Sequence, residues 1–119
     1  MRIGILSLVL GIFLLMPTGC YKDKEDLLYG AGDCDTTMVS FSMDIQAILN
    51  VSCATVGCHV QGGLGNGLFE NYNQVKSKVD NGSLRQRVLV QRDMPPSSPL
   101  SDCQLAHIEA WLNDGAPNN

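Results

Sequence analysis

Two cysteines and an adjacent histidine form the stretch of this sequence that is best suited to chemistry. Four residues separate Cys53 from Cys58, and His59 follows Cys58 directly. The two thiols can add across the vinyl groups of a haem as thioethers, and the neighbouring imidazole can then bind the iron from one face. The usual attachment site is C-x-x-C-H, with two residues between the cysteines. The intervening residues here are small or β-branched and uncharged, so the extra pair can bulge without burying a charge.

Two other interpretations of these residues remain open. Cys53 and Cys58 can form a local disulfide, or they can join His59 in a metal site, since zinc prefers thiolate and imidazole ligands. A structural zinc site needs four ligands. The remaining candidates are scattered singly along the chain: Cys34, Cys103 and His107. The sequence therefore favours haem attachment over zinc.

A methionine beside two prolines is a candidate ligand for the opposite face of the iron. Met94 is followed by Pro95 and Pro96, which restrict the backbone and exclude a helix there. A thioether in a stiff loop suits a sixth iron ligand, although methionine is more often a core residue. With the motif upstream, Met94 is the predicted second axial ligand. Met38 and Met43 precede the motif, and we expect them in the core.

Length and composition restrict the class of protein. The chain has 119 residues, a net charge of −4 and five cysteines. This length suggests one small domain, and the acidic balance argues against a nucleic-acid partner, which needs a basic face. Aromatic residues make up only 6 %, so a large apolar cofactor would help to complete the core. The sequence shows no Ser-His-Asp set or paired carboxylates, and we predict no enzymatic activity.

The N-terminus is typical of an exported protein with a lipid anchor. Residues 3–16 form an apolar run that suits a signal peptide and is too short to span a bilayer comfortably. A Pro-Thr-Gly tripeptide then precedes Cys20, which resembles a bacterial lipoprotein signal with Cys20 as the lipidated residue. We predict a signal peptide over 1–19 and a flexible charged tether over 20–33. An ordinary cleaved signal, with Cys20 as a spare thiol, is the alternative.

Residues 34–119 predict an all-α domain of about four helices. Apolar residues recur at helical spacing in each predicted helix. The expected helices run from an N-cap at Ser42 to about Asn50, from Asn71 to Asn81, from Ser83 through Leu89, and from a capping box of Ser101 and Gln104 to Gly115. A glycine-rich segment, 61–67, separates the first two and either lets backbone approach a flat cofactor or serves as a flexible loop.

Several side chains of these helices have more than one possible use. A buried Trp111 needs a partner for its indole N–H, and a haem propionate is one candidate. His107 is expected to be a surface or half-buried histidine in the last helix. Four basic residues either meet haem propionates or a redox partner, or form a solvated face: Lys76, Lys78, Arg85 and Arg87.

Taken together, the order of these motifs resembles a bacterial lipoprotein c-type cytochrome domain of the small mono-haem class. The resemblance covers roughly residues 34–119 and implies a cytochrome c-like bundle around one covalent haem c. It implies that Cys53 and Cys58 hold the thioethers and that His59 and Met94 are the axial iron ligands. An iron with both axial positions filled suits a one-electron carrier that serves redox partner proteins. The sequence departs from the family pattern in its four-residue cysteine spacing and in its imperfect lipoprotein signal.

Four cysteines, an even number, are left once Cys20 is assigned to the lipid, and Cys34 and Cys103 are the pair outside the motif. Cys34 lies before the first predicted helix and Cys103 begins the last. Small cytochromes pack these helices together, so the two thiols are expected to form a disulfide. The anchor implies the cell envelope of a Gram-negative bacterium, at the outer membrane and facing the periplasm or the cell surface.

Two alternative functions remain from the sequence. One is a disulfide-stapled surface lipoprotein that binds or scaffolds without haem, in which Cys53 pairs with Cys58. The other is a haem enzyme or sensor in which Met94 is labile and a small ligand takes its place.

Overall fold

The structure is a computed structural model that describes residues 34–119. Over this range the secondary structure is helical and contains no strands, in agreement with the all-α prediction. The predicted signal peptide 1–19, the lipidated Cys20 and the tether 20–33 lie outside the described residues. Among the helices of the described range, none has the length and apolar character needed to cross a membrane.

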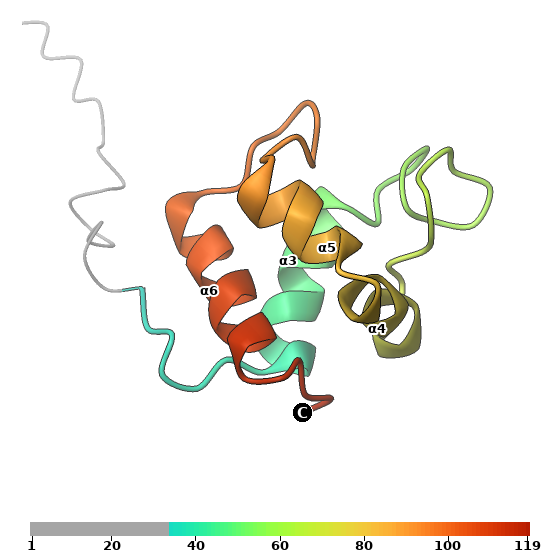
Figure 1. The fold of residues 1–119 in the computed structure, drawn as a ribbon. Helices are drawn as coiled ribbons and strands as arrows, with labels where there is room; N and C mark the ends of the chain where they lie inside the picture. Colours follow the sequence, from blue (N-terminus) through green and yellow to red (C-terminus); the bar gives the residue numbers. More distant parts are fainter. Residues whose placement is uncertain (1–33) are drawn as a thin grey trace, which may run out of the picture. The chain divides into compact units, whose positions relative to one another are not determined.

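The described chain forms four helices, two of which include a π-helical turn (Figure 1). The first helix consists of η1 (Phe41–Ile45) and α3 (Gln46–Ser52), and the second is α4 (Tyr72–Asp80). The third consists of α5 (Ser83–Arg85) and η2 (Gln86–Val90), and the last is α6 (Asp102–Asn113). A long segment without regular structure joins α3 to α4 and carries the Cys58–His59 pair.

The first helix begins at Ser40, so the prediction that Ser42 is its N-cap is wrong. Ser40 has the extended backbone that an N-cap needs, and its Oγ accepts a hydrogen bond from the Met43 N–H at 2.9 Å. Asp44 completes a reciprocal pair, because its Oδ2 accepts from the Ser40 N–H at 2.8 Å. These two bonds satisfy the N–H groups of Met43 and Ser40, so Ser42 lies inside a turn that Ser40 already caps.

The predicted starts of the second and last helices are confirmed. The Oδ1 of Asn71 accepts a hydrogen bond from the Gln74 N–H at 3.1 Å. At α6, the Oγ of Ser101 accepts from the Gln104 N–H at 3.2 Å, and the Gln104 Oε1 accepts from the Ser101 N–H at 2.9 Å. This reciprocal pair is the capping box that the sequence predicts.

The prediction that Ser83 is the N-cap of the third helix is wrong by one residue. Gly82 is its N-cap with φ of 77°, and Ser83 is already the first helical residue. The Oδ1 of Asn81 accepts from the Ser83 N–H at 2.9 Å. Gly82 has a left-handed backbone conformation, which turns the chain sharply between α4 and α5. A residue with a Cβ adopts this conformation only at a cost in free energy.

The core is built from the predicted apolar faces of the helices. The most deeply buried large side chains are Ile45, Leu49, Val75, Ile108 and Trp111. Helix α6 contacts both η1 and η2, and Figure 1 shows it running beside the first helix. The ring of Phe41 links three helices, with centroids 5.0 Å from Tyr72 and 5.6 Å from Trp111.

The indole of Trp111 finds its partner in the C-terminal turn rather than in a cofactor. Its side chain is 0 % exposed, and its Nε1–H donates to the carbonyl of Pro117 at 2.9 Å. Gly115 has φ of 89°, and the Ala116 N–H donates to the Trp111 carbonyl at 2.9 Å. This turn folds the chain end back over α6, so a haem propionate is not the partner of Trp111.

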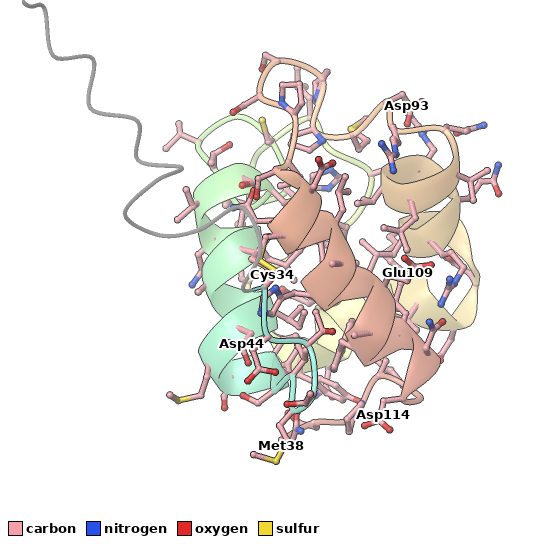
Figure 2. The ribbon with its side chains drawn as sticks, turned by 90° about the vertical axis from the view of Figure 1, so that its left-hand side faces the viewer. Cys34, Met38, Asp44, Asp93, Glu109 and Asp114 are labelled. Atoms are coloured by element: carbon pink, nitrogen blue, oxygen red, sulfur yellow. A yellow bond between two sulfur atoms is a disulfide. The ribbon has the colours of Figure 1, made fainter. Side chains whose placement is uncertain are left out.

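Met38 and Met43 lie on the surface, so their predicted place in the core is wrong. Their side chains are 91 % and 78 % exposed. Phe41 and Ile45 occupy the inner face of η1, which leaves Met43 on its outer face. Met38 belongs to the segment before η1, and Figure 2 shows it pointing away from the helices.

The predicted disulfide between Cys34 and Cys103 is confirmed. Its Sγ atoms are 2.06 Å apart and its Cα atoms 5.5 Å apart. The bond joins the segment before η1 to the first turn of α6, and Figure 2 shows it between them. It closes a loop with a sequence separation of 69 residues, long enough for a large effect on the unfolded chain.

Candidate functional site

All four residues predicted to hold a cofactor line one cavity. Cys53, Cys58, His59 and Met94 belong to its wall, and its volume is about 460 Å³. Small-molecule and cofactor sites measure about 300–1,000 Å³. The cysteines and histidine come from the segment after α3, and the methionine comes from the segment between η2 and α6. The fold therefore places both predicted axial ligands against the same space.

The rest of the cavity wall is mainly apolar. The apolar side chains come from the glycine-rich loop and the segment after it, from the third helix and from the prolines after the methionine: Leu64, Phe69, Leu84, Val88, Pro95 and Pro96. Two cations, Lys78 and Arg87, also reach the wall. An apolar wall with two cations suits an apolar ligand that carries acidic substituents.

The residues between Cys53 and Cys58 form a turn that projects outward. The His59 N–H donates to the Cys53 carbonyl at 3.1 Å, so the loop between them closes on itself. Inside it, the Cys58 N–H donates to the Thr55 carbonyl at 2.9 Å, and Gly57 has φ of 84°. Val56 at the tip is 98 % exposed. Val56 and Gly57 thus lie in solvent, and both cysteines still line the cavity.

The imidazole of His59 is held in one orientation by backbone and ring contacts. Its Nδ1 lies 2.9 Å from the carbonyl oxygen of Gly67, and a carbonyl accepts only, so Nδ1 carries the proton. The ring stacks on Phe69 with centroids 4.3 Å apart and planes 6° apart. Metal-binding histidines commonly donate their second nitrogen to a carbonyl in this way. The arrangement leaves Nε2 as the basic nitrogen.

Two glycines of the 61–67 loop allow this close packing. A Cβ on Gly65 would lie 2.7 Å from His59 Nδ1, and a Cβ on Gly63 would lie 2.0 Å from the carbonyl oxygen of Cys58. Real Cβ atoms do not approach that closely. The sequence predicted a close backbone approach to a flat cofactor or a merely flexible loop. In the structure these glycines approach the histidine and cysteine that line the cavity.

The position of Met94 is set by a turn after the third helix. The Nε of Arg87 donates to both carboxylate oxygens of Asp93, at 2.7 and 2.9 Å, and the Asp93 N–H donates to the Arg87 carbonyl at 3.1 Å. Arg92 adopts φ of 53°, an uncommon conformation for a residue with a side chain. These contacts direct the chain back toward the cavity, where Met94 is half-buried.

The two cysteines at the cavity have different environments. Both thiols are free, with Cys53 buried and Cys58 exposed. Burial raises the pKa of the Cys53 thiol to about 11, and the nearby Cys58 adds to the increase. Thiolate is the nucleophilic form of cysteine. Cys58 is therefore accessible to reagents in solution, while Cys53 is shielded and stays protonated.

The four basic residues that the sequence singled out divide into two groups. Lys78 and Arg87 line the cavity, and Lys78 Nζ also donates to Asn66 Oδ1 at 3.1 Å. The other two have partners elsewhere: Lys76 forms an ion pair with Asp80, and Arg85 donates to Asn113. Only the first group lies at the cavity wall, and within it Arg87 is also paired with Asp93.

A second cluster of potential ligands lies outside the cavity. The sequence treats Cys34, Cys103 and His107 as scattered, yet their ligand atoms lie within 4.8 Å of one another. His107 is half-buried, as expected. The sequence could have predicted part of this cluster, because Cys103 and His107 are four residues apart and therefore share one helix face.

Comparison with protein-family models, with curated proteins and with solved structures finds no match for this chain. The residues and geometry of the cavity therefore carry the functional conclusion. Two cysteine thiols can form thioethers, and an imidazole and a thioether can bind a metal.

Proposed function

We propose that residues 34–119 bind one covalent haem c and that the protein is a one-electron carrier with no enzymatic activity of its own. The observation that carries the proposal is the convergence of Cys53, Cys58, His59 and Met94 on one cavity. A c-type attachment site needs two thiols beside a histidine. In this chain a methionine from a distant segment meets them at the same wall.

The attachment residues have separate tasks in this proposal. Cys53 and Cys58 anchor the cofactor through thioether bonds, and the outward turn between them accommodates the long spacing. His59 presents its basic Nε2 because Nδ1 is occupied by the Gly67 carbonyl. Bound haem would supply a one-electron iron couple, which no side chain in this cavity provides.

Met94 decides between electron transfer and ligand chemistry. A thioether in the second axial position leaves no open site for a substrate, and it raises the reduction potential compared with a second histidine. The ion pair between Arg87 and Asp93 holds the turn that precedes Met94. A fixed sixth ligand keeps the structural change between the two oxidation states small, which favours fast electron exchange.

The other residues of the wall provide the surroundings that a haem needs. The apolar side chains exclude water from its faces. Lys78 and Arg87 are the cations placed to balance the propionate carboxylates. Burial of the iron in an apolar wall is a second factor that raises the potential.

The cellular setting of the proposal rests on the N-terminal sequence. Cys20 would carry the lipid, and residues 20–33 would form the tether that separates the domain from the outer membrane of a Gram-negative envelope. The domain would exchange electrons with redox partner proteins from that position. The proposal includes both orientations of the domain, toward the periplasm or toward the cell surface.

The disulfide between Cys34 and Cys103 favours one competing function, a stapled lipoprotein that binds or scaffolds without haem. That alternative predicts a second disulfide between Cys53 and Cys58. In the structure both of these thiols are free and line a cavity. A stapled scaffold has no need for a cavity of this composition, so we place haem binding first.

The test is to produce the chain in cells able to attach haem c and to record its oxidised and reduced spectra. Sharp reduced α and β bands that survive acid–acetone extraction are expected, since a thioether-bound haem is not extracted. The oxidised protein should show the weak far-red band of thioether-ligated ferric haem. Met94→Ala should remove that band, and Met43→Ala should keep it because Met43 is exposed and remote from the cavity.

A colourless protein, from cells shown to mature another cytochrome, would overturn the proposal and leave the stapled lipoprotein. Carbon monoxide binding to the reduced wild-type protein would instead indicate a labile Met94 and a sensor or enzyme. The carrier predicts that carbon monoxide binds Met94→Ala readily and the wild type poorly.

A further inference from the structure

Two sulfurs and one imidazole nitrogen meet where the segment before η1 crosses the first turn of α6. The Nδ1 of His107 lies 3.4 Å from the Sγ of Cys34 and 3.5 Å from the Sγ of Cys103. None of the three residues lines the cavity described above. The cluster is therefore a separate feature of the molecule, and it does not depend on haem binding.

These distances match the edges of a tetrahedral metal site. Zinc binds sulfur at about 2.3 Å and imidazole nitrogen at about 2.0–2.1 Å, so tetrahedral angles place nitrogen about 3.5 Å from each sulfur. Both nitrogen–sulfur distances of the cluster already have this value. Zinc sites with two cysteines and one histidine keep a fourth position for water. In the structure the bond between the two sulfurs keeps both of them from binding a metal.

We propose that Cys34, Cys103 and His107 form a redox-gated site for Zn²⁺, which is closed in the disulfide form and opens on reduction. A dithiol reductant breaks the disulfide bond by supplying two electrons and two protons, and it becomes a disulfide itself. Zn²⁺ then replaces the two thiol protons, which pass to the solvent. The Nδ1 proton of His107 is exchanged for one on Nε2, so the imidazole stays neutral.

The surroundings of the cluster favour the metal-bound state after reduction. Cys103 is the second residue of α6, where the helix N-terminus stabilises a thiolate. In the disulfide form the Nδ1 of His107 donates to the carbonyl of Cys103 at 2.9 Å, and binding of the metal replaces this hydrogen bond. A bound metal would again join the segment before η1 to α6. The fold would then keep a cross-link at this point in both oxidation states.

The test uses the full wild-type chain, reduced with a phosphine that is then removed. The rate of alkylation by iodoacetamide is measured at each cysteine by mass spectrometry, with and without Zn²⁺. We expect Zn²⁺ to slow alkylation of Cys34 and Cys103 by about tenfold or more, and a chelator to reverse the effect. Because the readout is resolved by residue, the thiols at the cavity do not obscure the result.

Variants of His107 test whether its imidazole binds the metal. His107→Ala and His107→Gln should each lose most of the protection, and Glu109→Gln, an exposed change on the same helix, should keep it. Unchanged alkylation rates in the reduced wild type with Zn²⁺ would overturn the proposal. Full protection in both His107 variants would also overturn it, because the imidazole would then not be a ligand. Neither result bears on whether the cavity binds haem.

Discussion

The Nδ1 of His59 lies 2.9 Å from the carbonyl oxygen of Gly67, and this contact determines which imidazole nitrogen is free to bind a metal. The carbonyl accepts the Nδ1 proton, so Nε2 is left unprotonated and available as a ligand. The glycine-rich loop that supplies the carbonyl also packs directly on the ring. The histidine is therefore oriented before any cofactor arrives.

Substitution of Gly65 should disturb this orientation. In Gly65→Ala the added Cβ would meet Nδ1 and Cγ of His59 at 2.7 and 2.8 Å, so the ring must move. We expect a clear loss of haem incorporation, measured as absorbance per protein after expression with the attachment machinery.

Gly62→Ala is the matched control for that experiment, because no atom lies within 4 Å of its added Cβ. Its φ of 80° costs about 1 kcal/mol of stability for a residue with a side chain, but His59 stays in place. Equal haem incorporation in Gly65→Ala and Gly62→Ala would show that the loop does not position the imidazole.

Removal of the Cys34–Cys103 disulfide should lower stability strongly. The bond spans a sequence separation of 69 residues, and a closed loop of that length contributes about 4 kcal/mol in the chain-entropy model. The double variant Cys34→Ser/Cys103→Ser should show this loss in denaturant unfolding without added metal. Reduced wild type is the comparison and should unfold at a similar denaturant concentration. A loss under about 1 kcal/mol would contradict the expectation.

Trp111→Phe separates a structural role of the indole from a cofactor role. The change removes the donor to the Pro117 carbonyl and leaves a void in a fully buried position, so we expect a loss on the order of 2 kcal/mol in unfolding free energy. The reduction potential of the haem-loaded protein should not change. A clear shift in potential would mean that the indole does contact the cofactor.

Tyr72→Phe provides a comparison without a void. Its hydroxyl donates to the carbonyl of Ala116 at 2.8 Å, so the change removes one hydrogen bond to the same C-terminal turn. A smaller loss of about 1 kcal/mol is expected. The difference between the two variants then measures the packing contribution of the indole.

The buried thiol of Cys53 predicts a pH-dependent stability for the haem-free chain. Its pKa is raised from an ordinary 9.0 to about 11 by burial and by Cys58. The folded chain therefore keeps a proton that the unfolded chain releases, and stability falls as the pH rises through this window. The loss should reach up to about 3 kcal/mol at high pH.

The measurement is urea unfolding of wild type and Cys53→Ala, both free of haem, at pH 8 and at pH values up to 11. Tyrosines and lysines also titrate in this range, so the relevant quantity is the difference between the two slopes. Cys53→Ala should lose less stability with increasing pH than wild type. Parallel curves would indicate that Cys53 is not shielded in the folded chain.

Much of the local structure follows from short-range patterns in the sequence. Asn71 and the pair of Ser101 and Gln104 cap their helices as predicted, because a cap depends on residues three positions apart. Ile45 and Leu49 are buried as their spacing indicates. The errors at Ser42 and Ser83 are shifts of one or two residues, because the N-caps are Ser40 and Gly82.

The pairing of Cys34 with Cys103 also followed from the sequence, through the number of cysteines and the expected packing of the first and last helices. The same reasoning did not predict that His107 lies beside the disulfide. Residue types and spacing identified Cys53, Cys58, His59 and Met94 as a possible ligand set, since their chemistry is a property of the side chains alone.

The sequence by itself thus determined the helices of the described range, two of their four N-caps, the disulfide pair and the identity of the candidate ligands. Only the tertiary structure decided that Met94 meets His59 at one cavity, that Nδ1 is bound by Gly67 and that Trp111 donates to Pro117. The physical reason is the range of the interactions involved. Helix spacing and capping act within one turn, whereas burial and cavity formation depend on segments that meet only when the helices pack.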